Sequence, residues 1–63
     1  MRTRIYLKDD ATDGEIIRIQ NEYFIYWIKA SRDRNGIYLE FKGKLDGKAE
    51  GLSGVSKVEH VPD

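Results

Sequence analysis

The sequence YFIYWI, positions 23 to 28, places six consecutive apolar or aromatic residues in a chain of 63. A half-buried strand alternates apolar and polar residues, because successive side chains point to opposite faces of the sheet. This stretch does not alternate, so as a strand it has two apolar faces. A chain of this size can hardly cover both faces alone, and we therefore expect the outer face to be a surface for a partner.

Lys29 follows the stretch and indicates which of the two faces points outward. A lysine tolerates the interior badly unless it is paired, so the residues that share its parity should face out. The outer set is then Tyr23, Ile25 and Trp27, and the core set is Phe24, Tyr26 and Ile28.

Further strand patterns and turn signals surround this stretch. Ile5 and Leu7 alternate with polar residues, and Asn35-Gly36 is a strong hairpin signal before the alternating segment from Ile37 to Lys42. We expect strands near residues 2–8, 15–20, 23–30, 37–42 and 56–61. The sequence thus predicts a single all-β domain over residues 1–63. Its fold would be a small five-stranded, strongly bent antiparallel sheet or barrel, with a short turn or 3-10 element before the last strand.

The alternative is an α+β fold with a helix near residues 13–30. Thr12 and Glu15 have the spacing of a helix capping box, and Ile16, Tyr23 and Trp27 roughly share a helical face. Gly14 in the first turn, and a segment rich in isoleucine and aromatic residues, favour the strand instead.

The amino-acid composition limits the classes of function that we expect for this protein. Eleven basic residues balance eleven acidic ones, so no global field favours nucleic acid or an anionic membrane. Cysteine is absent, and no apolar run is long enough for a signal peptide or a membrane span, so we expect a cytoplasmic protein. A domain this small buries a modest share of its surface, which makes oligomerisation a natural source of added stability.

The outward residues of the predicted strands form a candidate interaction face. Its members are Tyr6, Ile16, Tyr23, Ile25, Trp27 and Tyr38. Three interpretations stay open: a homo-oligomer interface, a site for another macromolecule, or a Trp27 that only closes the barrel or fills a gap under the glycine-rich segment 43–54.

Basic residues interleave with these aromatic ones, a pattern that also suits single-stranded nucleic acid. Tyr6, Tyr23 and Trp27 would stack on bases. The possible phosphate contacts are Arg4, Lys8, Arg18 and Lys29. Nearby aspartates and glutamates weaken such an electrostatic groove.

Catalytic, metal and cofactor sites have little support in the sequence. His60 is the only histidine and has only Glu59 as an acidic neighbour, which favours a surface or strand-edge residue over a general base. The acidic cluster from Asp9 to Asp13 lacks the other ligands of a calcium loop, and the segment 43–49 has the wrong glycine spacing for a phosphate loop. We expect no enzyme activity, no metal and no cofactor.

Two segments resemble small SH3-like or Sm-like barrels. The first runs from Ile5-Tyr6-Leu7-Lys8-Asp9-Asp10 through Gly14-Glu15-Ile16-Ile17 to Asn21-Glu22-Tyr23, and the second is Leu52-Ser53-Gly54-Val55. The resemblance implies a strongly bent sheet, ring-forming edge strands and often RNA binding. Ser53 stands where RNA-binding members carry a basic residue before the glycine, so the resemblance extends to the barrel and not to the RNA pocket.

These patterns together predict a non-enzymatic binding module. It would self-associate, as a dimer or larger, or dock on a protein partner through the aromatic face of its sheet. The alternatives are a small barrel that binds single-stranded nucleic acid, and a small inhibitor or regulator of a larger enzyme.

Overall fold

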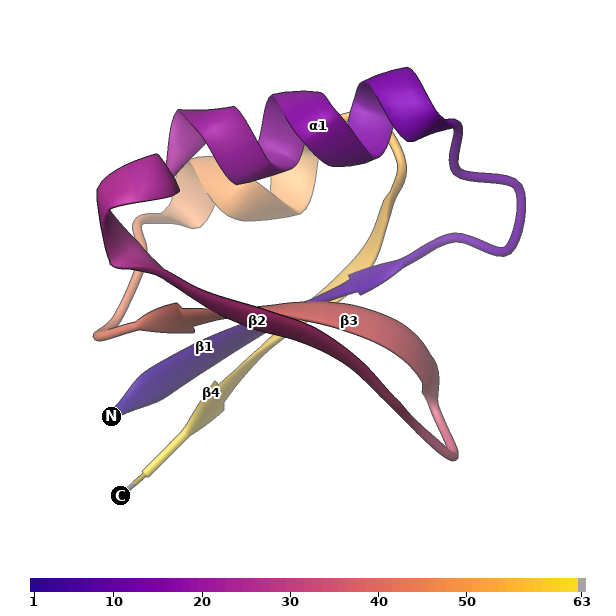
Figure 1. Cartoon of the computed structure of the whole chain (residues 1–63). Helices are drawn as coiled ribbons and strands as arrows, with labels where there is room; N and C mark the ends of the chain where they lie inside the picture. The colour runs from indigo at the N-terminus through magenta and orange to yellow at the C-terminus, as the bar shows by residue number, and fades with distance from the viewer. Residues whose placement is uncertain (63) are drawn as a thin grey trace.

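The computed structural model describes residues 1–62 as a β-rich domain with one α-helix and two 3-10 helices (Figure 1). In chain order the elements are β1 (Arg2–Leu7), α1 (Asp13–Glu22), η1 (Phe24–Tyr26), β2 (Trp27–Asp33), β3 (Gly36–Lys42), η2 (Gly47–Gly51) and β4 (Val55–Val61). The four strands form one open antiparallel sheet in the order β2-β3-β1-β4, so β2 and β4 are its edges.

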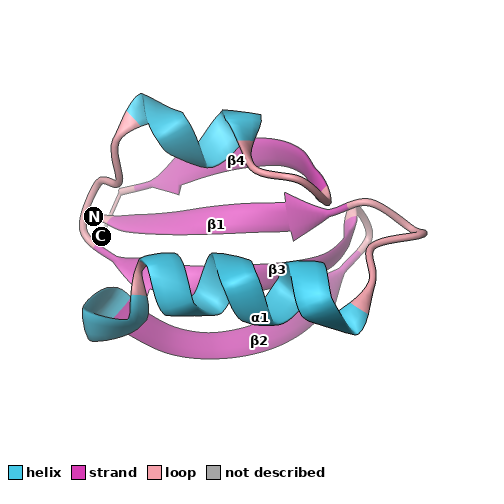
Figure 2. Ribbon diagram, turned by 90° about the horizontal axis from the view of Figure 1, so that it is seen from above, coloured by secondary structure: helices cyan, strands magenta, loops and turns pink. Residues whose placement is uncertain are grey.

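The helices lie on one face of this sheet, and no element of residues 1–62 covers the other face (Figures 1 and 2). Seen from above, α1 runs over the β3 and β2 half, and η2 lies over β4. The core fills the space between these layers. It includes Ile5 and Leu7 from β1, Leu39 and Phe41 from β3, and Ile19, Tyr23, Leu45, Ala49 and Val55 from the remaining elements.

Helix α1 begins at a complete capping box. The Thr12 hydroxyl accepts a hydrogen bond from the Glu15 backbone N–H, and the Glu15 carboxylate accepts one from the Thr12 N–H. Asp13 and Glu15 also place negative charge at the positive end of the helix dipole. Ile16, Ile19 and Tyr23 follow at intervals of three and four, which brings them to the face that packs on the sheet.

Several expectations about the architecture need correction. The domain is mostly β, and strands near residues 2–8, 37–42 and 56–61 are confirmed, as is a 3-10 element before the last strand. The five-stranded sheet or barrel is wrong, because the sheet has four strands and stays open. Residues 15–20 are helical: the alternative of a helix in this region is confirmed over Asp13–Glu22, although it does not extend to residue 30.

The aromatic stretch is not one strand, and its predicted division into inner and outer residues is wrong for every residue except Ile25. Tyr23 caps α1 and is 7% exposed, whereas Phe24 is 64% exposed in η1. Strand β2 starts only at Trp27, and a bulge between Trp27 and Lys29 shifts its register: Trp27 is opposite Phe41 on the core side, and Lys29 is opposite Glu40 on the open side. The side of the sheet on which Lys29 lies therefore does not predict the side on which Trp27 lies.

A buried threonine connects the start of β1 to the segment after β3. The Thr3 hydroxyl donates to the Gly43 carbonyl oxygen over 2.7 Å and accepts from the Leu45 N–H over 3.2 Å, and Thr3 is 0% exposed. This hydroxyl satisfies two backbone groups of a segment that has no regular partner strand. It thereby holds Leu45 in the core.

Candidate interaction surface

The six residues predicted for one interaction face do not form a common surface. Tyr23 lies in the core and Ile16 and Trp27 pack against it, on the side of the sheet that the helices cover. Tyr6 and Tyr38 belong to the opposite, open face, where they are 1% and 5% exposed. Ile25 alone is strongly exposed, at 83%.

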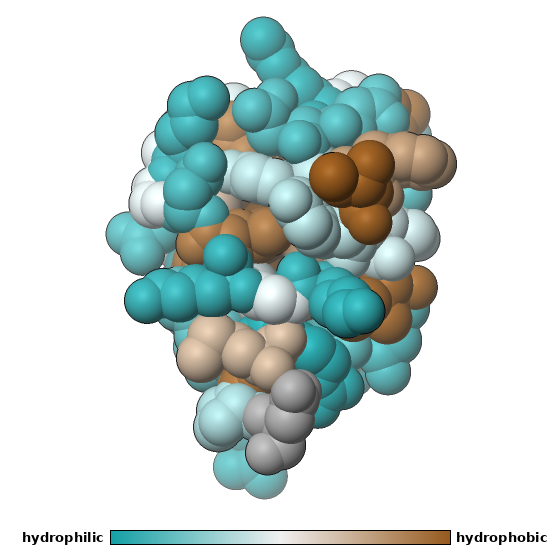
Figure 3. All heavy atoms as spheres, turned by 90° about the vertical axis from the view of Figure 1, so that its left-hand side faces the viewer, coloured by the Kyte–Doolittle hydropathy of each residue, from teal (hydrophilic) through white to brown (hydrophobic). Residues whose placement is uncertain are grey.

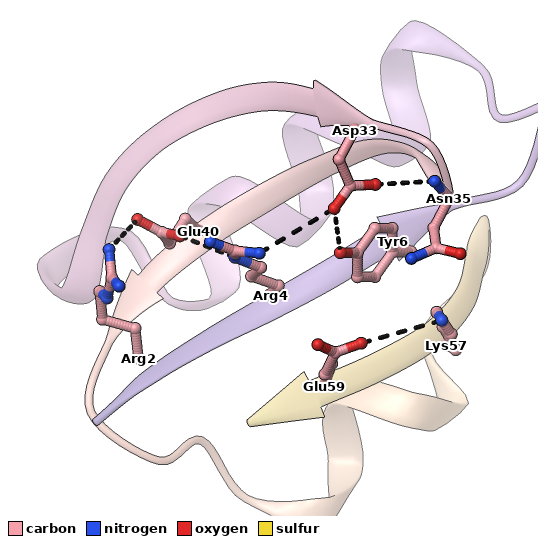
Figure 4. Close-up of polar contacts among 8 residues, drawn as sticks. All are labelled: Arg2, Arg4, Tyr6, Asp33, Asn35, Glu40, Lys57 and Glu59. Atoms are coloured by element: carbon pink, nitrogen blue, oxygen red, sulfur yellow. Dashed lines mark hydrogen bonds and ion pairs between the residues drawn. The ribbon is translucent and has the colours of Figure 1, made fainter. Parts of the chain in front are cut away.

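The open face of the sheet carries a network of charged side chains (Figure 4). Cross-strand pairing places Arg4 beside Glu40, and Arg4 Nε donates to the Glu40 carboxylate over 3.0 Å. Arg2 donates to the other oxygen of Glu40 over 3.3 Å, and Glu40 is only 1% exposed. Two arginines thus neutralise a carboxylate that would otherwise be costly to bury.

Tyr6 and Tyr38 also lie on this face, in contact with its charged side chains. The Tyr6 hydroxyl donates to Asp33 Oδ2 over 2.6 Å, and the Arg4 guanidinium lies 3.9 Å from the same oxygen. The Arg4 guanidinium also stacks over the Tyr38 ring at 4.8 Å, and the Lys57 ammonium lies 4.9 Å from the Tyr6 ring centroid. The rings are therefore covered by charged side chains of the same chain and do not form an exposed stacking platform.

The hydrogen bond between Tyr6 and Asp33 changes the titration of both groups. The Tyr6 hydroxyl is the main cause that lowers the pKa of Asp33, helped by the Asn35 N–H and by Arg4. Burial, together with this acidic partner, raises the pKa of Tyr6. The ionised form of Asp33 is therefore the form that the fold favours.

This pair predicts a pH-dependent effect of Tyr6→Phe on the melting temperature. Since the folded-state pKa of Asp33 is depressed, its stabilising contribution is present above the ordinary value of about 4 and is lost as the pH falls through the folded-state pKa. The difference in Tm between wild type and Tyr6→Phe should be largest at pH 7 and narrow below about pH 4. Tyr26→Phe, the same change at an exposed residue, is the control, and a pH-independent difference for Tyr6→Phe would contradict the assignment.

A second surface lies where α1 leads into the edge strand. Phe24, Ile25, Tyr26 and Ile28 are 64%, 83%, 45% and 42% exposed, and we call these four residues the apolar cluster. They lie in η1 and at the start of β2, at the end of the sheet where the chain termini are found (Figure 1). Figure 3 faces this end and shows apolar atoms at the surface among polar ones. Monomeric proteins seldom expose so many large apolar side chains together.

Strand β2 adds an open backbone edge to this cluster. It pairs only with β3, so its other side has no strand beside it, and most of its residues are exposed or half-buried. Such an edge is a template for pairing with another chain. The apolar cluster and the β2 edge are continuous in sequence, because Ile28 belongs to both.

The residues predicted to contact phosphates are distributed over different parts of the molecule. Arg4 is held by Glu40 and Asp33 on the open face, Lys29 lies on the same face of β2, and Arg18 is exposed on α1. Lys8 follows β1 and lines a pocket of about 310 Å³ beside Ile16 and Arg32. The four residues therefore do not line one common groove.

Residues 1–62 contain neither a cluster of metal-ligating side chains nor a membrane-spanning helix. No group of three or more histidine, cysteine, aspartate or glutamate side chains in this range is arranged to hold a metal ion. His60 is exposed on edge strand β4. Within the same range, no helix has both the length and the apolar character needed to cross a membrane.

Comparisons of the chain with models of known families, with curated proteins and with solved structures gave no significant match.

Sequence reasoning found one member of the exposed surface and misplaced the rest. Ile25 was predicted to face outward, but Phe24, Tyr26 and Ile28 were assigned to the core and are exposed. The capping box at Thr12 was the signal that could have placed them. A helix that starts there and ends near residue 22 leaves the next residues to turn back toward the sheet, outside any strand alternation.

Proposed function

We propose that this protein is a non-enzymatic binding module that self-associates through the apolar cluster and the adjoining edge of β2. The observation that carries the proposal is the exposure of Phe24, Ile25 and Ile28 beside an unpaired strand edge. Association along this edge pairs backbone groups of two copies and removes apolar area of each cluster from water in the same event.

The chemistry of the other surfaces supports this choice. The two carboxylates at the centre of the open face are satisfied within the chain, since Glu40 and Asp33 are matched by Arg2, Arg4 and Tyr6. The apolar cluster has no such internal compensation. A small domain with a modest core also gains stability by burying exposed apolar side chains against a second copy.

The proposal predicts a concentration-dependent dimer that Ile25→Ser weakens. Truncating an 83% exposed side chain should leave the fold intact, while it removes apolar contact from the interface and raises the dimer dissociation constant about tenfold or more. Sedimentation equilibrium over a range of protein concentrations measures this constant, and circular dichroism checks the fold.

Ile17→Ser is the matched control, because Ile17 is 55% exposed on α1 and lies outside the apolar cluster. It should associate like the wild type. A wild-type protein that remains monomeric at the highest soluble concentration would remove the proposal. Equal weakening by both substitutions would show that general surface hydrophobicity, and not this surface, drives association.

A further inference from the structure

We infer that two copies of the chain pair along β2 in an antiparallel register centred on Ser31, so that Lys29 of each copy faces Asp33 of the other. The inference rests on the proposed self-association and specifies its geometry. Each copy would contribute four strands to one continuous sheet.

The faces of β2 restrict the possible registers. Cross-strand partners show that Lys29, Ser31 and Asp33 lie on the open side, opposite Glu40, Tyr38 and Gly36. Residues directly opposite each other in an antiparallel pair point to the same face. A two-fold axis through one residue of β2 therefore keeps the open faces of both copies on the same side of the joined sheet.

Charge then selects among these registers. With the axis at Ser31, Lys29 of one copy is opposite Asp33 of the other, and the symmetry produces this pair twice. With the axis at Ala30, Lys29 would face only Ser31. Opposite charges directly across a strand pair stabilise it, so the Ser31 register is favoured.

Lys29 is available for such a pair. Lys29 forms no ion pair with any side chain of residues 1–62, and its own side chain is exposed. Asp33 is half-buried, with its carboxylate on the open face. The carboxylate of one copy would thus add the Lys29 ammonium of the other copy to its existing contacts with Tyr6 and Arg4.

The opposite edge strand, β4, also carries a lysine and an acidic residue, but these two side chains already contact each other. In β4, Lys57 lies 3.8 Å from Glu59 of the same strand and also covers the Tyr6 ring. Pairing along β4 would have to replace these contacts, whereas pairing along β2 adds contacts to a free lysine. The observations therefore favour β2 as the edge that joins the copies.

The Ser31 register places the apolar cluster of one copy at the same end of the joined strands as Ile37 of the other copy, which lies one strand further in, on β3. Antiparallel pairing about Ser31 places the start of β2 of one copy beside the turn between β2 and β3 of the other. Ile37 follows that turn and is 42% exposed. Ile28 of one copy and Ile37 of the other are thus at the same end of the joined strands.

A disulfide at the axis tests the register directly. The chain has no cysteine, so Ser31→Cys introduces a single thiol. Opposite residues at the centre of an antiparallel pair have Cα atoms about 4.5 to 5.5 Å apart, within the range that a disulfide spans. Under mild oxidation, Ser31→Cys should form a covalent dimer about 100-fold faster than chains that meet by random collision.

Ser56→Cys is the matched control, since Ser56 is an exposed serine on the other edge strand. Ser56→Cys should form a covalent dimer only at the rate set by random collision between chains. If wild type dimerises but Ser31→Cys cross-links no faster than Ser56→Cys, the β2 register is wrong and the proposed self-association stands. If wild type is a monomer, both the register and the self-association are wrong.

Charge reversal supplies a second, independent test. Lys29→Asp places two aspartates against each other and Asp33→Lys two lysines, so each variant alone should dimerise about tenfold more weakly than wild type. An equimolar mixture should recover association, because the mixed pair restores both opposite-charge contacts. A mixture no tighter than its components would overturn the register. Since Asp33→Lys also removes the Tyr6 hydrogen bond, circular dichroism must confirm its fold, and the Ser31→Cys result decides if it does not fold.

Discussion

Phe41→Ala is expected to remove about 3 to 5 kcal/mol from the free energy of unfolding, the largest loss that we predict for a single substitution. Phe41 is 0% exposed, and its ring packs edge-to-face against Tyr23 at 5.8 Å and against Trp27 at 5.6 Å between centroids. Truncating a buried phenylalanine costs about 3 to 5 kcal/mol. A domain of this length has a free energy of unfolding of about 3 to 9 kcal/mol, so the substitution removes much or all of it.

Phe24→Ala is the matched control for this prediction. It makes the same chemical change at a side chain that is 64% exposed. Urea unfolding followed by Trp27 fluorescence should show a nearly unchanged midpoint for Phe24→Ala, at protein concentrations low enough to keep the chain monomeric. Similar losses for the two variants would contradict the assignment of Phe41 to the centre of the core.

Thr3→Val is expected to have the second largest effect, although it preserves the shape of the side chain. The change removes the hydroxyl that accepts from the Leu45 N–H and donates to the Gly43 carbonyl, at a site with no exposed surface. Leaving buried backbone groups without partners costs about 1 to 3 kcal/mol. In a domain of this size each kcal/mol lowers Tm by about 4 to 8 °C, which a thermal melt resolves easily.

Thr3→Ser separates the hydroxyl from the methyl group. The serine retains both hydrogen bonds and loses one buried methyl, so its cost should be only about 1 kcal/mol. Thr3→Val should be clearly less stable than Thr3→Ser. The reverse order would mean that apolar packing, and not the two backbone hydrogen bonds, determines the contribution of Thr3.

The strands with clean alternation were predictable from the sequence, and the segment between them was not. In β1 and β3, residues such as Ile5, Leu39 and Phe41 repeat every second position because one face of the sheet is covered by helices. In α1, Ile16, Ile17 and Ile19 fit both a strand and a helix. Packing against the sheet selects the helical period, with Ile19 buried and Ile17 exposed.

The apolar cluster was predicted only in part, because three local changes in backbone structure interrupt the aromatic stretch. The end of α1, the 3-10 turn and the bulge each rotate the chain, so residues two apart, such as Trp27 and Lys29, lie on different faces. Parity arguments hold only within an uninterrupted strand. A surplus of apolar residues correctly indicated exposed apolar surface, but not which of the six residues provide it.

Charge on β4 determines how large an assembly built through β2 can become. Joining two copies along β2 leaves a β4 edge at each end of the sheet, and this edge exposes Lys57, Glu59 and His60. Charged side chains on an outer strand disfavour the addition of a further chain. Growth should therefore stop at two copies and give a closed pair instead of a fibre, even at the high concentrations where open sheet edges usually aggregate.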